Sequence, residues 1–230
     1  MVSAFGGNSV QIGGPTGAFI VIIYNIVQQY GLAGLAVATF MAGCILLVMG
    51  LFRLGTVIKF IPYPIVVGFT AGIAVTIFST QMPDFFGLAI DEKVPGDFIG
   101  KWSVYLRHFP SAHLMTAAVG LVFGVAGITT IGDRFGELAV AAPHPDFDFS
   151  IATLNRLLPS AFTIAMLGAI ESLLSATVAD GRTGDRTDCD TELIGQGLAN
   201  MVVPVFGGIP VTGAIARTMT NITSGGRPPV

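Results

Sequence analysis

Two short stretches of the chain repeat one pattern of residue types, and both could bind an anion through the backbone. The sequence reads GGPTGAFIVII at 13–23 and GGIPVTGAIA at 207–216, so each places glycines and a proline before Thr-Gly-Ala. Proline is tolerated at a helix start, where its missing N–H breaks no hydrogen bond. The first N–H groups of a helix lack intrahelical partners and carry about half a positive charge, which favours an anion. Thr16 and Thr212 could cap these starts or contact the ligand.

The position of the repeat in two halves of the chain is informative. Two helix starts facing each other at mid-membrane would form an anion site from backbone alone, and glycines would let the ligand approach closely. In the alternative interpretation, both stretches are ordinary turns before helices. Paired, Gly/Pro-interrupted hydrophobic segments in two halves of a chain are nevertheless the best sequence indication of a transporter site.

A single acid lies inside a long apolar segment. Glu171 is near the centre of residues 157–179, where a carboxylate costs about 2.5–3.5 kcal/mol and usually has a function. Ser175, at i+4, lies on the same helical face. We expect Glu171 to carry a proton, or to hold a sodium ion together with Ser175; the alternative is a structural ion pair with Arg217. Arg217, four residues after Gly213, could instead add positive charge to the anion site or extend to an interface.

The segments that must position these residues have the composition of a membrane protein. The chain of 230 residues is 52% hydrophobic and 11% charged, with a mean hydropathy of +0.76; a soluble domain usually carries about 25% charged residues. No Asp, Glu, Lys or Arg occurs in residues 1–52, 60–83 or 193–216. Apolar runs of about 20 residues are long enough to cross a bilayer. We therefore predict an all-α, multi-pass membrane protein.

Hydrophobic periodicity and punctuation predict the order of the segments. The expected apolar segments are 16–29, 32–52, 64–82, 114–131, 157–179 and 193–205. The first and the last are too short to cross the membrane alone. Residues 98–109 mix aromatic and basic side chains, which is typical of a helix at the membrane interface.

Other classes of function lack support in the sequence. No basic tract indicates nucleic-acid binding, and no span carries a His/Cys metal set. Ser172, Ser175 and His144 show no nucleophile–base arrangement, so we expect no enzyme, no catalytic residue, no metal and no cofactor. Cys44 lies in an apolar run and Cys189 between two acids, so neither is expected to be a reactive thiolate or part of a disulfide framework.

The residues from 167 to 227 carry a resemblance to a known family. LGAIESLLSATVADGRTGDRTDCDTELIGQGLANMVVPVFGGIPVTGAIARTMTNITSGGR resembles the most characteristic block of the sulfate permease family of anion transporters. GGPTGAF resembles the family's third transmembrane helix, and RLGTVIKFIPYPIVVGFTAGIA resembles its fourth-to-fifth helix junction. The resemblance implies a fold of two inverted seven-helix repeats, in which the third and tenth helices are half-helices. Each half-helix follows a short strand, and their N-termini face each other at the midplane.

The resemblance implies roles for residues on three segments. The expected substrate-binding residues are Thr16, Gly17, Ala18 and Phe19 on the third helix and Gly213, Ala214, Ile215 and Arg217 on the tenth. The expected coupling-ion residues are Glu171 and Ser175 on the eighth helix. In a bicarbonate-transporting branch of the family these two positions are Asp and Thr and bind sodium. Glu and Ser at these positions favour a proton-coupled or uncoupled member.

The resemblance covers only part of the family plan. We expect residues 1–230 to be a partial transport domain, with 1–112 supplying helices three to five and the interfacial helix, and 113–230 supplying helices six or seven to ten. The first two helices, the last four helices and the STAS domain would be absent. Residues 114–131 have room for about one helix where the family has two. Loss of one span would reverse the direction in which every later helix crosses the membrane, and the two half-helix starts would no longer meet from opposite sides. We therefore expect the complete protein to have both helices, and this fragment alone to be inactive.

The expected function is secondary transport of a small inorganic or carboxylic anion coupled to protons. Sulfate is the first expectation, with bicarbonate, chloride or a dicarboxylate as alternatives. A nucleobase–cation symporter of the same architecture would need an acid on the tenth helix, where this chain offers Arg217. An anion channel or a voltage-driven motor stays open. We expect a homodimer in the bacterial inner membrane, with H⁺ or Na⁺ as coupling ion and the lipid bilayer as its surroundings.

Overall fold

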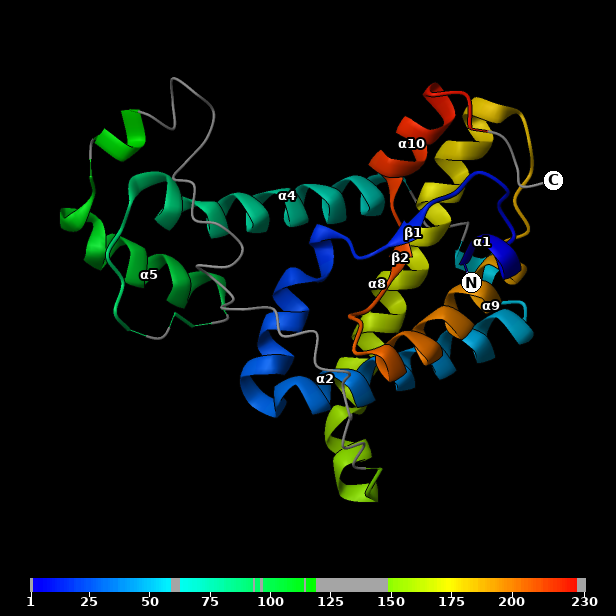
Figure 1. Ribbon diagram of the computed structural model, residues 1–230, viewed down its shortest axis with the longest axis horizontal. Helices are drawn as coiled ribbons and strands as arrows, with labels where there is room; N and C mark the ends of the chain where they lie inside the picture. Colours follow the sequence, from blue (N-terminus) through cyan, green and yellow to red (C-terminus); the bar gives the residue numbers. More distant parts are fainter. Residues whose placement is uncertain are drawn as a thin grey trace. The chain divides into compact units, whose positions relative to one another are not determined.

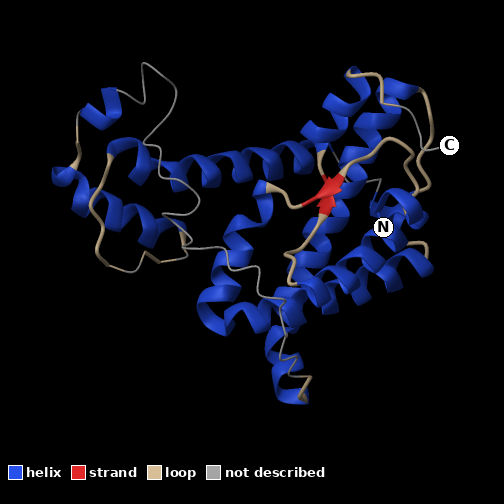
Figure 2. Ribbon diagram, viewed as in Figure 1, coloured by secondary structure: helices blue, strands red, loops and turns tan. Residues whose placement is uncertain are grey.

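The structure consists of helices and one pair of short strands (Figures 1 and 2). This computed structural model describes residues 2–58, 63–92, 94–95, 97–113, 115–118 and 149–226. Packing divides the chain into two compact units, one formed by residues 1–62 with 142–230 and the other by residues 63–141. Most of the helix predicted at 114–131 lies outside the described residues.

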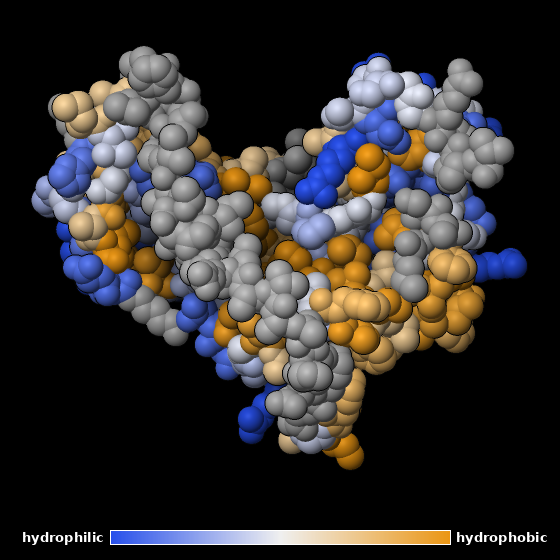
Figure 3. Space-filling view, in the orientation of Figure 1, coloured by the Kyte–Doolittle hydropathy of each residue, from blue (hydrophilic) through white to orange (hydrophobic). Residues whose placement is uncertain are grey.

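The larger unit contains both repeated stretches. Its elements are α1 (Val2–Phe5), β1 (Gly13–Gly14), η1 (Gly17–Phe19), α2 (Ile20–Leu51), α3 (Gly55–Ile58), α8 (Ile151–Thr183), α9 (Cys189–Val202), η3 (Val203–Phe206), β2 (Thr212–Gly213) and α10 (Ile215–Thr223). Its core forms where α2 packs against α8 and α9. On the face shown in Figure 3, hydrophobic side chains gather over α9 and hydrophilic side chains over α10.

The smaller unit is built around two helices. They are α4 (Tyr63–Phe86) and α5 (Phe98–His108), and the short η2 (Phe109–Ser111) follows α5. Trp102 Nε1 donates a hydrogen bond of 3.1 Å to Ser79 Oγ, which joins α5 to α4. The helix predicted at 98–109 is thereby confirmed, and its place at a membrane interface stays a prediction.

A sharp break divides α2 into a short arm and a long arm. Gly31 has φ 69° and ψ −173°, a conformation that glycine adopts without steric cost. The hydrophobic pattern separates 16–29 from 32–52 at the same place. Residues 20–30 cover roughly 16 Å, about half of a bilayer's hydrocarbon core. The first arm is therefore a half-helix, and Figure 1 shows the bend at which the second arm leaves it.

Two of the described helices are long and apolar enough to cross a membrane. They cover Ile22–Leu51, which includes the break at Gly31 and has a mean hydropathy of 2.4, and Ile151–Thr183, with a mean hydropathy of 1.7. The second contains the predicted segment 157–179 and extends beyond it at both ends. Ser150 Oγ accepts a hydrogen bond from Thr153 N at the start of α8, and Gly184 at φ 80° ends it, which is typical helix capping.

The helix α9 begins before the apolar run that predicts it. The sequence predicts a helix over 193–205, whereas α9 begins at Cys189 because the Asp188 side chain accepts hydrogen bonds from the N–H groups of Asp190 and Thr191. An aspartate in this position satisfies backbone donors that have no intrahelical partner. Hydrogen bonds from the backbone and side chain of Thr191 hold the pKa of Asp188 below its ordinary value of 3.8.

Replacement of Asp188 by Ala should lower the free energy of unfolding by about 1 kcal/mol, because the first turn of α9 loses its cap. The Asp188→Asn variant keeps a capping oxygen and should lose less. Since the pKa of Asp188 is lowered on folding, its contribution is fully present above pH 3.8 and is lost as the pH falls through the lower, folded-state pKa. Thermal unfolding in detergent at pH 7 and pH 3 measures both effects, and equal stability of all three proteins at pH 7 would contradict the assignment.

The strands β1 and β2 pair antiparallel and bring the two repeated stretches together. Gly13 pairs with Gly213 and Gly14 with Thr212. Ala214 N also donates a hydrogen bond of 2.9 Å to Ile12 O. The two half-helix starts therefore meet in this structure, whereas the number of helices between them, on which the sequence-based expectation depended, lies outside the described residues. The strand pairing and the packing of α2 with α8 and α9 hold them together.

Candidate functional site

The paired strands place two helix starts with free backbone donors in one unit. At the first start, the N–H groups of Gly17 and Ala18 have no acceptor among the described residues. At the second, the N–H groups of Ile215, Ala216 and Arg217 likewise have none within the described part of the chain. Neither start has a side-chain cap. Five donors and the positive ends of two helices are therefore available to an anion.

Arg217 lies next to the opposite half of the site. Its guanidinium Nη1 lies 2.5 Å from the position that a Cβ atom on Gly14 would take, so the Arg217 side chain lies against the backbone at Gly14. Gly14 precedes the first half-helix, whereas Arg217 belongs to the second, α10. Arg217 is exposed, and no described acid lies within ion-pair distance of it. The structural ion pair between Glu171 and Arg217, the alternative from the sequence, is therefore not formed.

Glu171 joins α8 to the first helix start. Thr16 Oγ1 donates a hydrogen bond of 2.7 Å to Glu171 Oε2. Thr16 therefore does not cap η1 with its side chain, and it binds the carboxylate at the residue directly before the free N–H groups. Glu171 is only partly buried, so a proton or an ion can reach it.

Ser175 points to a different neighbour from the one that the sequence suggests. It is 0% exposed, and its hydroxyl donates a hydrogen bond of 3.2 Å to Thr218 Oγ1 in α10. Thr218 Oγ1 also accepts a hydrogen bond of 3.1 Å from Ile12 N. Ser175 therefore ties α8 to α10 and to the segment before β1, and it makes no hydrogen bond to Glu171 within the described structure.

The other predicted residues of the site differ in exposure. Gly17 and Ile215 are exposed and Ala18 is half-buried, whereas Gly213 and Ala214 are buried. Phe19 is 1% exposed, and its ring faces Gly168 of α8. Phe19 thus anchors the half-helix in the core, and its ring has little surface left for a ligand.

Sequence reasoning did not single out Gln11 and Thr218, which connect the elements of the site. The Nε2 group of Gln11 occupies the space that a side chain on Gly213 would need. Gln11 Nε2 donates hydrogen bonds to Ser172 O and Ser172 Oγ in α8, of 3.1 and 3.2 Å. The available signal was a glutamine in an apolar, charge-free region, directly before a predicted binding stretch.

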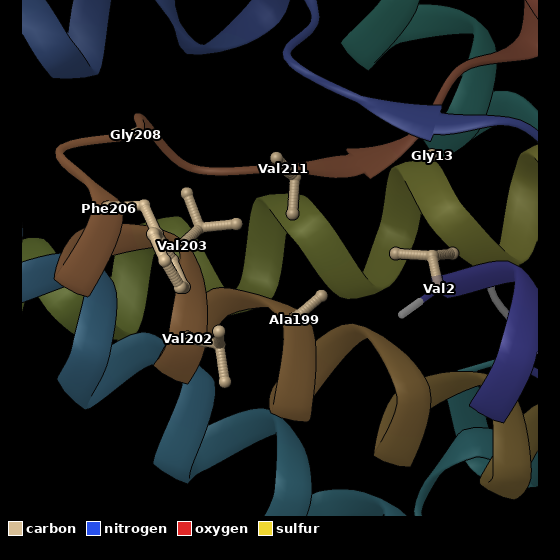
Figure 4. Close-up of a pocket in the computed structure, with 8 residues that line it drawn as sticks. All are labelled: Val2, Gly13, Ala199, Val202, Val203, Phe206, Gly208 and Val211. Carbon is tan, nitrogen blue, oxygen red and sulfur yellow. The ribbon is translucent and has the colours of Figure 1, made fainter.

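A pocket of about 540 Å³ opens on another part of the same unit (Figure 4). It lies beside α9, η3 and the strands, and its lining is almost entirely apolar: Val2, Gly13, Ala199, Val202, Val203, Phe206, Gly208 and Val211. No charged or hydrogen-bonding side chain lines it, so it does not suit a small anion. It shares only Gly13 with the paired strands.

Sequence comparison finds relatives along the whole chain. The sequence profile of the Sulfate permease family matches residues 1–147 and 123–230. The chain is 44% identical over 262 residues to "Putative sulfate transporter YvdB" of Bacillus subtilis, which covers 100% of the chain and 49% of the relative. It is 31% identical to "Bicarbonate transporter BicA" of Synechocystis, over 97% of the chain and 46% of the relative. The chain thus spans about half the length of the curated relatives it matches.

Solved structures with the same fold are also transporters. The transmembrane domain of a cyanobacterial bicarbonate transporter, BicA, superposes with a TM-score of 0.79 and 28% identity, over 97% of this chain and 66% of that chain. The murine anion transporter Solute Carrier 26 family member A9, in its inward-facing state, gives a TM-score of 0.78 at 16% identity, over 97% and 46%. The predicted all-α transporter fold is confirmed, and none of these relatives is named as an enzyme. Since the family profile matches the chain from its first residue to its last, this chain belongs to the sulfate permease family.

Proposed function

We propose that the chain forms the anion-binding core of a secondary transporter. The observation that carries this proposal is the pairing of β1 with β2, which joins two helix starts whose five N–H groups have no acceptor among the described residues. Such groups favour an anion strongly when water is excluded. The names of the relatives, sulfate and bicarbonate transporters, agree with this chemistry.

We propose sulfate as the first substrate, with bicarbonate or a dicarboxylate as alternatives. All three are oxyanions, and the planar guanidinium of Arg217 can donate two parallel hydrogen bonds to an oxyanion. The nucleobase symporter is less well supported, because the described residues of α10 contain no acid. A neutral base would leave the charge of Arg217 without compensation.

We propose that Glu171 couples transport to protons. Its carboxylate lies one hydrogen bond from Thr16, directly before the free N–H groups of Gly17 and Ala18. An ionised carboxylate there repels an incoming anion, and protonation removes that repulsion. By thermodynamic linkage, a bound anion then raises the affinity of Glu171 for a proton by the same factor by which the proton raises the affinity for the anion. Sodium is the alternative coupling ion, held by Glu171 together with Ser175. Ser175 also positions α8 against α10 through its hydrogen bond to Thr218.

We propose that the chain is part of a longer transporter. The alignment with YvdB runs over 262 residues, whereas the chain has 230, so the relative has additional residues within the aligned region. The excess is enough for one membrane-spanning helix of about 20 residues. We propose that the complete protein has two helices near 114–131, and that 1–112 and 113–230 are partial repeats, from the family resemblance. A homodimer in the bacterial inner membrane is proposed from the family resemblance.

Uptake of labelled anions into liposomes by the complete protein tests the function. We expect uptake of sulfate above that of bicarbonate, chloride and fumarate, and stimulation by an inward proton gradient. Arg217→Ala should raise the half-saturating concentration about 10-fold to 100-fold, because a hydrogen bond to a charged group contributes about 1.5–3 kcal/mol. Arg217→Lys keeps the charge and serves as the matched control. Uptake of uracil without uptake of any anion would replace the proposal with the nucleobase symporter.

A further inference from the structure

One face of α10 binds the backbone of the segment that leads into β1. Thr218 and Asn221 are three residues apart and lie on one face of the helix, and Ala214, the N-cap residue, is four positions before Thr218. Ala214 N donates a hydrogen bond of 2.9 Å to Ile12 O. Thr218 Oγ1 accepts one of 3.1 Å from Ile12 N. Asn221 Nδ2 donates one of 2.9 Å to Val10 O.

These hydrogen bonds determine how α10 is rotated about its own axis. Thr218 is 0% exposed, and its Oγ1 accepts a second hydrogen bond, of 3.2 Å, from Ser175 Oγ in α8. A rotation of α10 by one residue position, about 100°, would remove the partners of Ile12 N and Val10 O. A backbone N–H or C=O that loses its partner away from water is costly. One rotation of α10 is therefore strongly favoured.

The position of the Arg217 guanidinium depends on this rotation. Arg217 directly precedes Thr218 in α10, and its Nη1 lies 2.5 Å from the position of a Cβ atom on Gly14, beside the first half of the site. No described acid forms an ion pair with Arg217. No salt bridge within the described structure therefore holds this positive charge in place, and the setting of α10 on the segment before β1 does so instead.

We propose that Thr218 and Asn221 are positioning residues that set the anion affinity of the site through Arg217. This inference rests on the proposed function, in which Arg217 binds the anion. Thr218 is fully buried and Asn221 Nδ2 donates to Val10 O, so both side chains are occupied by protein partners. They hold the guanidinium beside the two helix starts before the anion arrives. A site that is ordered in advance loses less free energy when it binds its ligand.

The concentration dependence of labelled sulfate uptake into liposomes by the complete protein tests this role. Thr218→Val keeps the shape of the side chain and removes its oxygen. Thr218→Val and Asn221→Leu should each raise the half-saturating sulfate concentration about tenfold, as expected for residues in one hydrogen-bond network. The maximal rate should stay the same, because the lost interaction affects binding. Thr218→Ser keeps the oxygen and should retain the wild-type value.

Thr220→Val is the matched control on the same helix. Thr220 is exposed, and its Oγ1 donates a hydrogen bond to Ala216 O within α10. The same chemical change at this position removes no contact with the segment before β1. Uptake by Thr220→Val should therefore have the wild-type half-saturating concentration.

A double-mutant cycle with Arg217→Ala separates positioning of Arg217 from a general structural role. Thr218→Val should raise the half-saturating concentration about tenfold in the wild-type background and less than about twofold in the Arg217→Ala background. An equal factor in both backgrounds would overturn the inference, as would wild-type values for folded Thr218→Val and Asn221→Leu.

Gel filtration shows whether each variant is folded. If Thr218→Val is not, the half-buried Asn221 offers the same cycle through Asn221→Leu. The failure of this inference differs from the failure of the proposed function. If the wild-type protein takes up no anion, the proposed function fails. If it takes up sulfate and the two substitutions act independently, only the role of Thr218 and Asn221 is rejected.

Discussion

Replacement of Glu171 by Gln should abolish the stimulation of anion uptake by an inward proton gradient. Thr16 Oγ1 donates a hydrogen bond of 2.7 Å to Glu171 Oε2, and glutamine can still accept this bond through its amide oxygen. The variant therefore keeps the local structure and loses the group that can gain and release a proton. Uptake without a gradient should continue, because the neutral amide resembles the protonated acid in charge.

The measurement is labelled sulfate uptake into liposomes by the complete protein, with the external pH held at 6 or 7.5 and the internal pH at 7.5. Wild-type uptake should respond to the gradient, and the variant should show equal rates in both conditions. Ser175→Ala is the matched control on the same helix, because Ser175 Oγ donates to Thr218. A gradient response of wild-type size in Glu171→Gln would reject Glu171 as the proton carrier. If Ser175→Ala is folded and loses the gradient response, Ser175 takes part in coupling together with Glu171.

Replacement of Gly197 by Leu should prevent folding of the larger unit. A Cβ atom on Gly197 would lie 2.6 Å from Leu47 N and 2.8 Å from Gly43 O, which are backbone atoms of α2. The same holds for Gly43 in α2: a Cβ atom added there would lie 2.8 Å from Gly197 O in α9. Small residues allow two membrane helices to come this close. A leucine must push α2 and α9 apart, which costs more than the about 1–3 kcal/mol of ordinary overpacking.

Fluorescence-detected gel filtration of the protein in mild detergent measures this effect as the monodisperse fraction. Because folded domains are stable by only about 5–15 kcal/mol, we expect almost complete loss of the folded peak for Gly197→Leu and partial loss for Gly197→Ala. Gly181→Ala is the matched control, since a Cβ at that helical position meets no other atom within 4 Å. A normal peak for Gly197→Leu would show that α2 and α9 do not pack through these glycines.

Local sequence signals predicted several elements correctly. The break before residue 32 follows from a glycine between two apolar runs, and Gly31 has the positive φ that such a break requires. The segment predicted as a helix at 98–109 forms α5, Phe98–His108. The start of α9 was predicted four residues too late, because apolar periodicity does not register a polar capping residue such as Asp188. A capping signal was present in the sequence, in the aspartate that precedes the helix.

The details of the site depended on contacts that no local pattern contains. The sequence placed Ser175 and Glu171 on one face of α8, but their partners come from different elements: Thr16 for Glu171 and Thr218 for Ser175. Phe19 was expected to bind substrate, and its burial against α8 follows from packing alone. Glu192 lies in the most charged region of the sequence, where a solvent-exposed acid would be the ordinary expectation. Its burial depends on donors from the N-terminal segment and from α8.

The sequence by itself determined that this is an α-helical membrane protein with two helix starts marked by glycine and proline. Charge, hydropathy and the positions of Gly and Pro determine local structure through residues close together in the chain, so these features can be predicted from sequence. Only the tertiary structure decided that the two starts meet through Gly13 and Gly213 and that Arg217 lies against the opposite half. Contacts between residues about 200 positions apart depend on the packing of whole helices. A glycine is needed for close packing only at a position where another backbone or side chain contacts it, and the sequence does not show which positions those are.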